Sequence, residues 1–540
     1  MIRDLDERAE DGGIEADLCI IGAGAAGITI AHALRDSSLD VVVLEAGGLE
    51  IEADSQAIYE GDVVGLDYYP IDTTRLRYFG GSTNHWSGRC MKLDPIDFEV
   101  RDWIPDSGWP IERETLLPYY EPAQARVELP NRLEYEQFWE EFGIERTGFD
   151  AEKLIENVDQ RSPPTRFGEV YRDDLEAAER CTIWLHANLQ DIKTSADADH
   201  VESVTVRSFK GKEAKVKAKA YVLATGAMEN ARLLLANRAT EPTGFGNRHD
   251  LVGRYFSDHA HMLIGDIVSA DGVALLDSAR RQFRGGAEFH PRFALPDALQ
   301  AEYRVTNSAC WLVSELKASD GMAAAADLIE RMRGMEGRPP YSDSAWRIMA
   351  NLDDVAVAAW QRFVQGRKTI QEISYIGLFG CTDPVPNPDS RVLLDEEDVD
   401  SFGMPRAVLD WRLTELDHVS LRKLAEVIGA ELARTGKGRL KLHDWFMEEP
   451  SADWMMRFHE SPEAETFSYL DWISNHAIGT TRMADDPKKG VVDADGKMHY
   501  VDNFWIAGSS VFPTSGSAQP TLTIVALALR MADHLKEKLA

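Results

Sequence analysis

Cysteine is scarce in this chain, and its five cysteines stand far apart in the sequence. Their number is odd, no Cys-x-x-Cys pair occurs, and none has the spacing of a cysteine and histidine metal site. The pattern argues against a cysteine-bound metal and indicates a reducing compartment.

Basic residues and long apolar runs are also few. The chain has 58 Lys and Arg against 91 Asp and Glu, which gives a formal net charge of −33. No basic run compensates locally, so nucleic acid is excluded as a partner and the acidic surface is interpreted as solvated. No apolar stretch is as long as a membrane-spanning helix, which needs about 18 residues. Residues 1–13 lack the apolar core of a signal peptide. We therefore expect a cytoplasmic protein without a membrane span.

What the sequence does contain is a glycine fingerprint near its start. The motif Gly-Ala-Gly-Ala-Ala-Gly begins at Gly22, between an apolar run and a helical pattern. Gly22 is expected to make a tight turn, Gly24 to let a pyrophosphate approach the backbone, and Gly27 to let the helix lie close on the strand. A second apolar run ends in Glu45, placed to bind a ribose 2′-hydroxyl. The segment predicts a dinucleotide site.

Four further blocks follow downstream, and the first three contain glycine. They read GGSTNHWSG at 80–88, ATGAMENARLLL at 224–235, HAIGTTRM at 476–483 and QPTLT at 519–523. With the fingerprint and Glu45, these blocks resemble the glucose–methanol–choline (GMC) family of flavin oxidoreductases. Within that family, the His-Trp pair and the PTLT ending are most similar to pyranose oxidases and bacterial sugar 3-dehydrogenases. An NAD dehydrogenase is the poorer alternative, because a nicotinamide enzyme needs only the first block.

The resemblance implies FAD as the cofactor and assigns two catalytic positions. His476 matches the family's catalytic histidine and would take the hydroxyl proton while hydride leaves carbon for the flavin, a role that suits an imidazole. Gln519 stands where the family has histidine or asparagine. An amide cannot take a proton but can orient the substrate hydroxyl. The expected cofactor-binding residues are Gly22, Gly24, Ala25, Ala26, Gly27, Glu45, Ala46, Gly80, Gly81, Ser82, Asn84, His85, Trp86, Ser87, Gly226, Gly508, Pro520 and Thr521.

Two histidine questions stay open at this point. His85 stands where some relatives attach the flavin covalently; the alternative is a ring packed against the flavin edge, and we expect flavin to be released on denaturation. His259 and His261 have the i, i+2 spacing of a metal pair. No carboxylate or cysteine completes a set in the sequence, so we expect a structural role and no metal.

The expected fold is α/β, with α+β character over two domains. A Rossmann-like FAD-binding domain takes residues 1–100, 155–265 and 471–540, and a discontinuous substrate domain on an antiparallel sheet takes 266–470. Residues 101–154 form a wrapping or lid segment. Finer expectations are an antiparallel meander over 183–222, strands over 369–378 and 390–394, and helices over 318–335, 416–433 and 524–539.

The predicted function is FAD-dependent oxidation of a sugar or glycoside hydroxyl to a carbonyl, with oxygen, a quinone or another electron acceptor. The alternatives are oxidation of an aromatic or aliphatic alcohol, a lyase on the same scaffold with structural flavin, and a redox-silent flavin-binding partner. A homo-oligomer and a small partner subunit are both compatible with the sequence.

Overall fold

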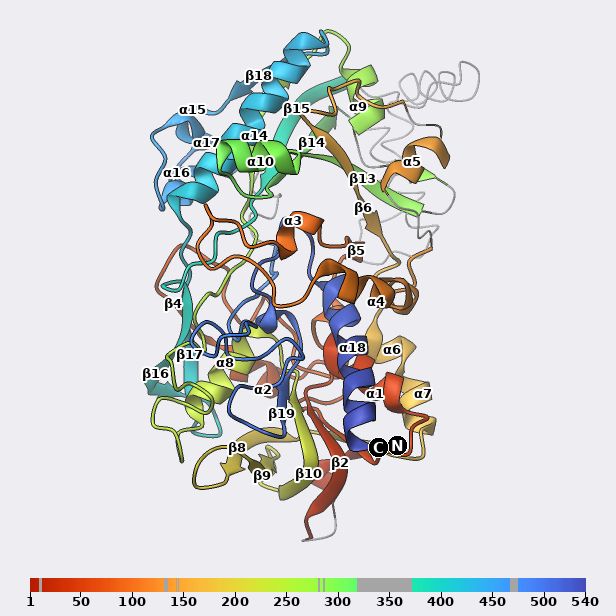
Figure 1. Ribbon diagram of the computed structural model, residues 1–540, viewed down its shortest axis with the longest axis vertical. Helices are drawn as coiled ribbons and strands as arrows, with labels where there is room; N and C mark the ends of the chain where they lie inside the picture. The colour runs from red at the N-terminus through yellow and green to blue at the C-terminus, as the bar shows by residue number, and fades with distance from the viewer. Residues whose placement is uncertain are drawn as a thin grey trace, which may run out of the picture.

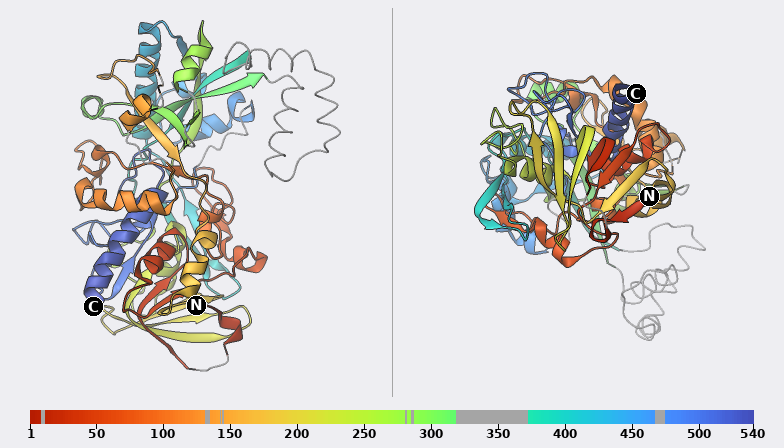
Figure 2. Two further views of the ribbon diagram at one scale, coloured as in Figure 1. Left: turned by 90° about the vertical axis from the view of Figure 1, so that its right-hand side faces the viewer. Right: turned by 90° about the horizontal axis from the view of Figure 1, so that it is seen from below.

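The computed structural model describes residues 1–8, 12–130, 135–141, 143, 145–279, 282–284, 287–317, 372–466 and 474–540. Two large sheets lie toward opposite ends of the molecule, and both termini lie at the end that holds the first sheet (Figures 1 and 2). This mixed architecture confirms the expected α/β class.

The first sheet carries the fingerprint at the end of a central parallel strand. From one edge to the other its strands are β1 (Ile2–Asp4), β7 (Cys181–Leu185), β3 (Val41–Leu44), β2 (Ile14–Ile21), β10 (Glu213–Leu223), β9 (Val201–Arg207) and β8 (Asn188–Thr194), and β19 (Phe504–Ile506) also pairs with β10. The strands from β1 to β10 run parallel, as does β19, whereas β9 and β8 are antiparallel.

Strand β10 joins the two halves of this sheet. Its first residues alternate between exposed and buried and pair with β9, and its last four are buried and lie between β2 and β19. The antiparallel meander expected over 183–222 is formed by β8, β9 and the first half of β10, and β10 then continues into the parallel half of the sheet. The first half of β10 alternates polar and apolar residues because one of its faces is exposed to solvent. The second half is continuously apolar because both of its faces are covered.

The second sheet is antiparallel, as expected for the substrate side. Its order is β18 (Arg439–Leu442), β11 (His261–Val268), β15 (Glu372–Cys381), β14 (Ala309–Lys317), β13 (Ala287–Ala294), β6 (Ile155–Arg161) and β5 (Arg89–Cys90), and β12 (Gln282–Arg284) pairs with β13. A third, smaller sheet contains β16 (Arg391–Val399), β17 (Pro405–Asp410) and β4 (Gly61–Val63).

The helices pack around these sheets. The longer ones are α1 (Ala25–Leu34), α4 (Arg113–Arg126), α8 (Ala227–Ala236), α14 (Glu415–Arg434) and α18 (Thr521–Leu539). The shorter ones are α2 (Ala53–Gln56), α3 (Pro95–Phe98), α5 (Tyr135–Glu141), α6 (Phe167–Val170), α7 (Arg172–Ala177), α9 (Gly272–Ala279), α10 (Asp297–Tyr303), α15 (Asp444–Met447), α16 (Trp454–His459) and α17 (Pro462–Thr466). The 3₁₀ turns are η1 (Leu5–Glu7), η2 (Ala57–Tyr59), η3 (Gly81–Asn84) and η4 (Ser509–Val511). None of the described helices has both the length and the apolar run needed to cross a bilayer.

The expected helices over 416–433 and 524–539 are confirmed by α14 and α18, and the strands over 369–378 and 390–394 by β15 and β16. The start of the first strand and the helix predicted over 318–335 lie outside the described residues. The division into domains stays a prediction. Strand β6, which the predicted boundaries assign to the FAD-binding part, pairs in the second sheet.

Candidate active site

The turn between β2 and α1 needs glycine where neighbouring backbone atoms leave no room for a side chain. Gly22 has φ +102°, and a Cβ there would lie 2.6 Å from the Ala224 carbonyl oxygen. A Cβ on Gly27 would lie 1.9 Å from the Gly22 carbonyl oxygen, because the helix packs directly on the turn. A Cβ on Gly24 would meet nothing within 4 Å. A side chain would therefore clash with the backbone at Gly22 and Gly27, whereas Gly24 borders open space.

A cavity of about 430 Å³ opens above this turn and extends to His476 and Gln519. It brings together segments from both ends of the chain and from its middle, as the separated glycine blocks predict. The expected site residues on its wall are Gly22, Gly24, Ala25, Ala26, Glu45, Ala46, Gly81, Ser82, His85, Trp86, Ser87, Gly226, Gly508, Pro520 and Thr521.

Three expected cofactor residues do not line the cavity but hold its wall. Gly27 packs α1 on the turn, and the Gly80 amide donates to the Ala23 carbonyl at 2.9 Å, which ties the second block to the fingerprint. The Asn84 side-chain amide donates to the Phe79 carbonyl at 2.9 Å.

Glu45 lies at the end of β3, as predicted, and is 5% exposed. Its carboxylate accepts hydrogen bonds from the backbone amides of Ala23 and Gly47, both at 2.9 Å. Burial raises its pKa, and the backbone amides act in the opposite direction. The carboxylate is thus held in place at the cavity wall, and its contact with a ribose stays a prediction.

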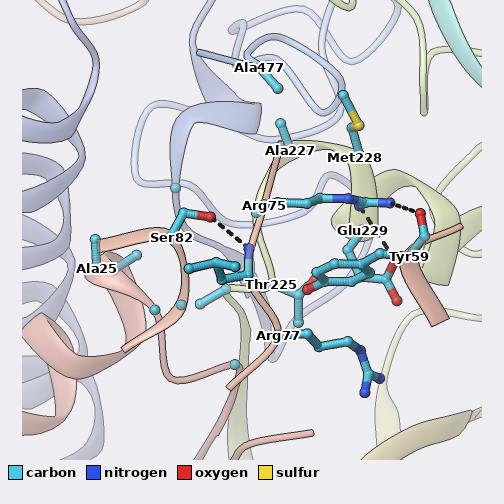
Figure 3. Close-up of a pocket in the computed structure, with 18 of the residues that line it drawn as sticks. Ala25, Tyr59, Arg75, Arg77, Ser82, Thr225, Ala227, Met228, Glu229 and Ala477 are labelled. Carbon is cyan, nitrogen blue, oxygen red and sulfur yellow. Dashed lines mark hydrogen bonds and ion pairs between the residues drawn. The ribbon is translucent and has the colours of Figure 1, made fainter. Parts of the chain in front are cut away.

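Two arginines that the sequence reasoning missed also line the cavity (Figure 3). The Arg75 guanidinium lies 4.0 Å above the Tyr59 ring and 3.7 Å from a Glu229 oxygen, and Arg77 donates to the Ser55 hydroxyl at 3.1 Å. Their sequence signal is weak, because isolated arginines in a polar loop are usually solvated. Their charge makes this part of the cavity suitable for a phosphate-containing ligand.

At the other end, His476 is held by neighbours from distant segments. Its backbone amide donates to Asp258 Oδ1 at 2.9 Å, and its Nδ1 lies 3.1 Å from Nδ1 of His259. The His259 Nε2 lies 2.9 Å from the Gly516 carbonyl oxygen and 3.1 Å from the Ser515 hydroxyl. His259 is 1% exposed, so these contacts are made away from solvent.

These contacts determine where the ring protons lie. A carbonyl oxygen only accepts, so His259 Nε2 must donate to Gly516. Because burial lowers the pKa of His259 to about 4, the ring is neutral and its Nδ1 is an acceptor. His476 must therefore donate from its own Nδ1, which leaves the lone pair on Nε2. No described residue hydrogen-bonds that nitrogen, and His476 lines the cavity.

The same surroundings keep His476 unprotonated. Burial, followed by the neighbouring His259, His261 and Arg89, holds the pKa of His476 well below its usual value. The imidazole is therefore ready to accept a proton at neutral pH.

Gln519 lies at the start of α18 and is 2% exposed. Neither its Oε1 nor its Nε2 finds a hydrogen-bond partner among the described residues. Since a buried amide without partners is costly, both atoms are suited to a ligand in the cavity.

The structure brings one carboxylate near His259, in a group that contains His476 and not His261. Asp258, His259 and His476 offer atoms that all lie within 4.8 Å of one another. The Asp258 carboxylate, however, already accepts from the Tyr68 hydroxyl at 2.6 Å and from the amides of His259 and His476 at 2.7 and 2.9 Å. The absence of a metal stays a prediction.

Fold and cavity together are those of a dinucleotide-dependent oxidoreductase: a glycine turn at one end of a long cavity and a neutral histidine at the other. Residues 17–245 match the family model described as FAD dependent oxidoreductase, and residues 386–528 match the one described as GMC oxidoreductase. The chain therefore carries an FAD-dependent oxidoreductase domain and a GMC oxidoreductase C-terminal domain, and it is an FAD-dependent oxidoreductase.

Individual relatives span nearly the whole chain at low identity. The chain is 25% identical to 6'''-hydroxyparomomycin C oxidase of Streptomyces lividus, over 97% of this chain and 92% of that protein. It is 22% identical to the fructose dehydrogenase large subunit of Gluconobacter japonicus, over 97% and 98%. The structure of pyridoxine 4-oxidase from Mesorbium loti superposes with a TM-score of 0.51 at 18% identity, covering 96% of this chain and 98% of that one. This last similarity concerns the fold alone.

The residues present fit FAD. The open space above Gly24 and the two arginines suit its pyrophosphate, and the unpartnered Gln519 amide suits a polar group at the other end. His85 lines the cavity beside Trp86, whose indole N–H donates to the Thr165 carbonyl at 2.9 Å. Whether His85 bonds to the flavin stays a prediction.

Proposed function

We propose that this protein oxidises a hydroxyl of a sugar or glycoside to a carbonyl, with His476 as the base and Gln519 orienting the substrate. The observation that carries the proposal is the pairing of His259 with His476, which leaves the His476 Nε2 lone pair free at a cavity where Gln519 has both amide atoms unbonded. Bound FAD supplies the hydride acceptor.

The chain's own residues then divide the work. His476 Nε2 takes the proton of the substrate hydroxyl. The oxygen then donates electron density to the carbon that carries it, and hydride leaves that carbon more readily. The Asp258 carboxylate fixes the His476 backbone, and His259 fixes its ring. Gln519 donates to or accepts from substrate hydroxyls, so the carbon to be oxidised is presented in one orientation.

The substrate class is supported by the names of the relatives. One is an oxidase of a paromomycin derivative and another is a dehydrogenase of fructose, and each aligns over nearly its whole length. Their names also divide between oxidase and dehydrogenase, so oxygen and a quinone are both candidate acceptors for this chain. A cytoplasmic location is part of the proposal and is supported by five cysteines that are all buried and unpaired.

Anaerobic mixing of the purified flavoprotein with a panel of sugars, glycosides and aromatic alcohols tests the proposal. Sugars or glycosides should bleach the flavin absorbance, and oxygen or a quinone should then restore it. If only aromatic alcohols bleach the flavin, the substrate is an aromatic alcohol and not a sugar or glycoside. A flavin that no alcohol reduces, but that dithionite does, would favour the lyase alternative.

A second measurement concerns the base. His476→Ala should keep its FAD and lower the rate of flavin reduction by about 10²- to 10⁴-fold, the usual contribution of a general base. A variant that is reduced as fast as the parent would show that the base is elsewhere.

A further inference from the structure

Arg89 is a second charged group at the substrate end of the cavity. It lies in β5 and lines the cavity with His476 and Gln519. One guanidinium nitrogen, Nη2, is paired with Asp159 of β6, and the guanidinium lies 4.8 Å from the centre of the Trp311 ring. These two contacts hold the side chain in one position.

The rest of the Arg89 guanidinium is available to a ligand. Its Nε and Nη1 form no hydrogen bond with any residue that the structure describes, and the side chain is 14% exposed in total. The Asp159 carboxylate also faces a second guanidinium, because its other oxygen lies 4.0 Å from Nε of Arg292. Arg292 in turn has a second carboxylate beside it, since its Nη2 lies 3.7 Å from Asp94.

The charge of Arg89 reaches the reacting group. It is among the causes that lower the pKa values of His259, His261 and His476. The charge comes from a residue on the wall of the same cavity, so a ligand beside His476 also experiences it.

Among the described residues of the cavity wall, every acidic side chain already has a partner. Glu229 and Asp400 are both paired with Arg232, and Glu45 accepts from backbone amides. The other described wall residues near His476, among them Ser87, Ser474 and Asn475, are uncharged.

We propose that Arg89 forms an anion subsite and that the alcohol oxidised here carries a carboxylate, as in a sugar acid or an acidic glycoside. A guanidinium with N–H groups that no described residue occupies can donate to a carboxylate and carries the complementary charge. A substrate carrying an ammonium group would instead meet like charge. This inference rests on the proposed function, since it assumes that the alcohol binds beside His476.

The subsite is tested first without turnover. Acetate, titrated into the oxidised FAD-bound protein, should give a saturable change in the flavin absorbance, and the neutral isostere acetamide should give none. Arg89→Gln should weaken acetate binding by about 10- to 100-fold, the usual effect of losing a hydrogen bond to a charged group. Arg89→Lys should retain part of the affinity. Arg238→Gln, which changes a 41% exposed arginine paired with Glu396, is the matched control and should bind acetate as the parent does.

Folding is controlled separately. If Arg89→Gln expresses poorly, the double variant Arg89→Gln with Asp159→Asn removes both members of the ion pair and should give the same loss of acetate binding. The proposal is overturned if the parent does not bind acetate. It is also overturned if Arg89→Gln and the double variant bind acetate as tightly as the parent.

The substrate readout uses methyl β-glucuronide and methyl β-glucoside, which differ by a carboxylate in place of a hydroxymethyl group. The parent should be reduced anaerobically at lower concentrations of the acid, and Arg89→Gln should lose that preference through the dissociation constant of the acid and not through the limiting rate of flavin reduction. Equal use of both sugars by the parent contradicts the anion subsite but keeps the proposed function. If neither sugar nor any other sugar reduces the flavin, while acetate binds through Arg89, the proposed function fails and the subsite stands.

Discussion

At the scale of single residues, the site depends on keeping histidines neutral and oriented. Burial lowers the pKa of His259 to about 4 and places that of His476 well below its usual value. A histidine with a lowered pKa stays unprotonated as the pH falls, so it can act as a base over a wider range. The second requirement is a fixed orientation of the His476 ring, which comes from the contact between its Nδ1 and the Nδ1 of His259.

The pH dependence of flavin reduction follows from this. The rate should stay level as the pH falls through about 6.5, the ordinary pKa of histidine, and should decline only in more acidic solution. Arg89→Gln removes one cation that opposes protonation of His476, so its decline should begin at higher pH. Stopped-flow reduction from pH 5 to pH 8 measures both curves, and a parent curve that already declines near neutrality would contradict the expected environment.

His259 is a positioning residue in this scheme. His259→Leu removes the acceptor for the His476 Nδ1 proton and frees the ring to adopt the tautomer whose Nε2 is protonated. We expect flavin reduction to slow by about 10- to 100-fold at constant FAD content, since a base with the wrong tautomer is ineffective. His259→Gln, whose amide oxygen accepts a hydrogen bond, should recover part of the rate.

The matched control is His418→Leu. His418 is also buried, and its Nε2 lies 2.9 Å from the Phe446 carbonyl oxygen, but it does not line the cavity. It should lose stability without slowing flavin reduction. Equal slowing in both variants would mean that His259 acts only through the fold.

Gln519 should contribute less than the base. Gln519→Ala should cost about 1–3 kcal/mol of transition-state binding, the value of one or two hydrogen bonds in a dry pocket. Gln519→Asn places at this position the amide that the family resemblance implies, and a rate near the parent would show that the amide group matters more than the length of the side chain. Anaerobic reduction rates decide between these outcomes, and a loss in Gln519→Ala as large as that in His476→Ala would contradict the proposed roles.

At the scale of elements, the glycines of the turn between β2 and α1 have two different roles, one in folding and one in ligand binding. Gly22 and Gly27 are required by the chain's own atoms, since a Cβ at either would lie within 2.6 Å of a carbonyl oxygen. Gly24 has φ −87°, which any residue adopts, and open space above it. Its glycine is therefore explained by a ligand and not by the fold.

Two variants separate these uses. Gly24→Val should fold with the far-ultraviolet circular dichroism of the apoprotein but bind no FAD, because its side chain occupies the space expected for the pyrophosphate. Gly27→Val should fail to fold or melt at much lower temperature, because the helix must move off the turn. A yellow Gly24→Val protein with stoichiometric FAD would show that the fingerprint does not hold the cofactor.

At the scale of the whole molecule, buried ion pairs join parts that the sheets do not. Arg232 of α8 is 1% exposed, pairs with Glu229 on its own helix and with Asp400 beyond β16, and donates to the Pro405 carbonyl at the start of β17. It therefore connects a helix that follows the first sheet with the third sheet. Removing Arg232 leaves the Asp400 carboxylate buried without its ion-pair partner, and leaves Glu229 with Arg75 alone.

Arg232→Met should destabilise the protein by about 3–5 kcal/mol, the usual result of breaking a buried pair. Arg238→Met, just beyond the same helix, breaks an exposed pair and should change the free energy of unfolding by less than about 1 kcal/mol. Urea unfolding followed by tryptophan fluorescence, at equal FAD occupancy, compares them. Similar stability of the two variants would mean that the buried cluster is not a stabilising connection.

The sequence alone determined the parts of this protein that depend on local chemistry. Glycines at fixed spacing between a strand and a helix, and an acid at the end of the next strand, predict a dinucleotide site because each acts through its own backbone or its immediate neighbours. The helices α14 and α18 follow from periodicity in the same way, whereas His476 is predicted as the base from the resemblance of its motif to a family.

Only the tertiary structure decided which groups surround that base. His259 and Asp258 meet His476 across more than two hundred residues of sequence, and Arg89 meets Asp159 because β5 and β6 lie side by side in the second sheet. Hydrogen bonds and ion pairs of this kind depend on strand register and on how two sheets approach one cavity, and no spacing in the sequence encodes that distance. The tautomer of the base and the charge at the substrate end are therefore properties of the folded chain.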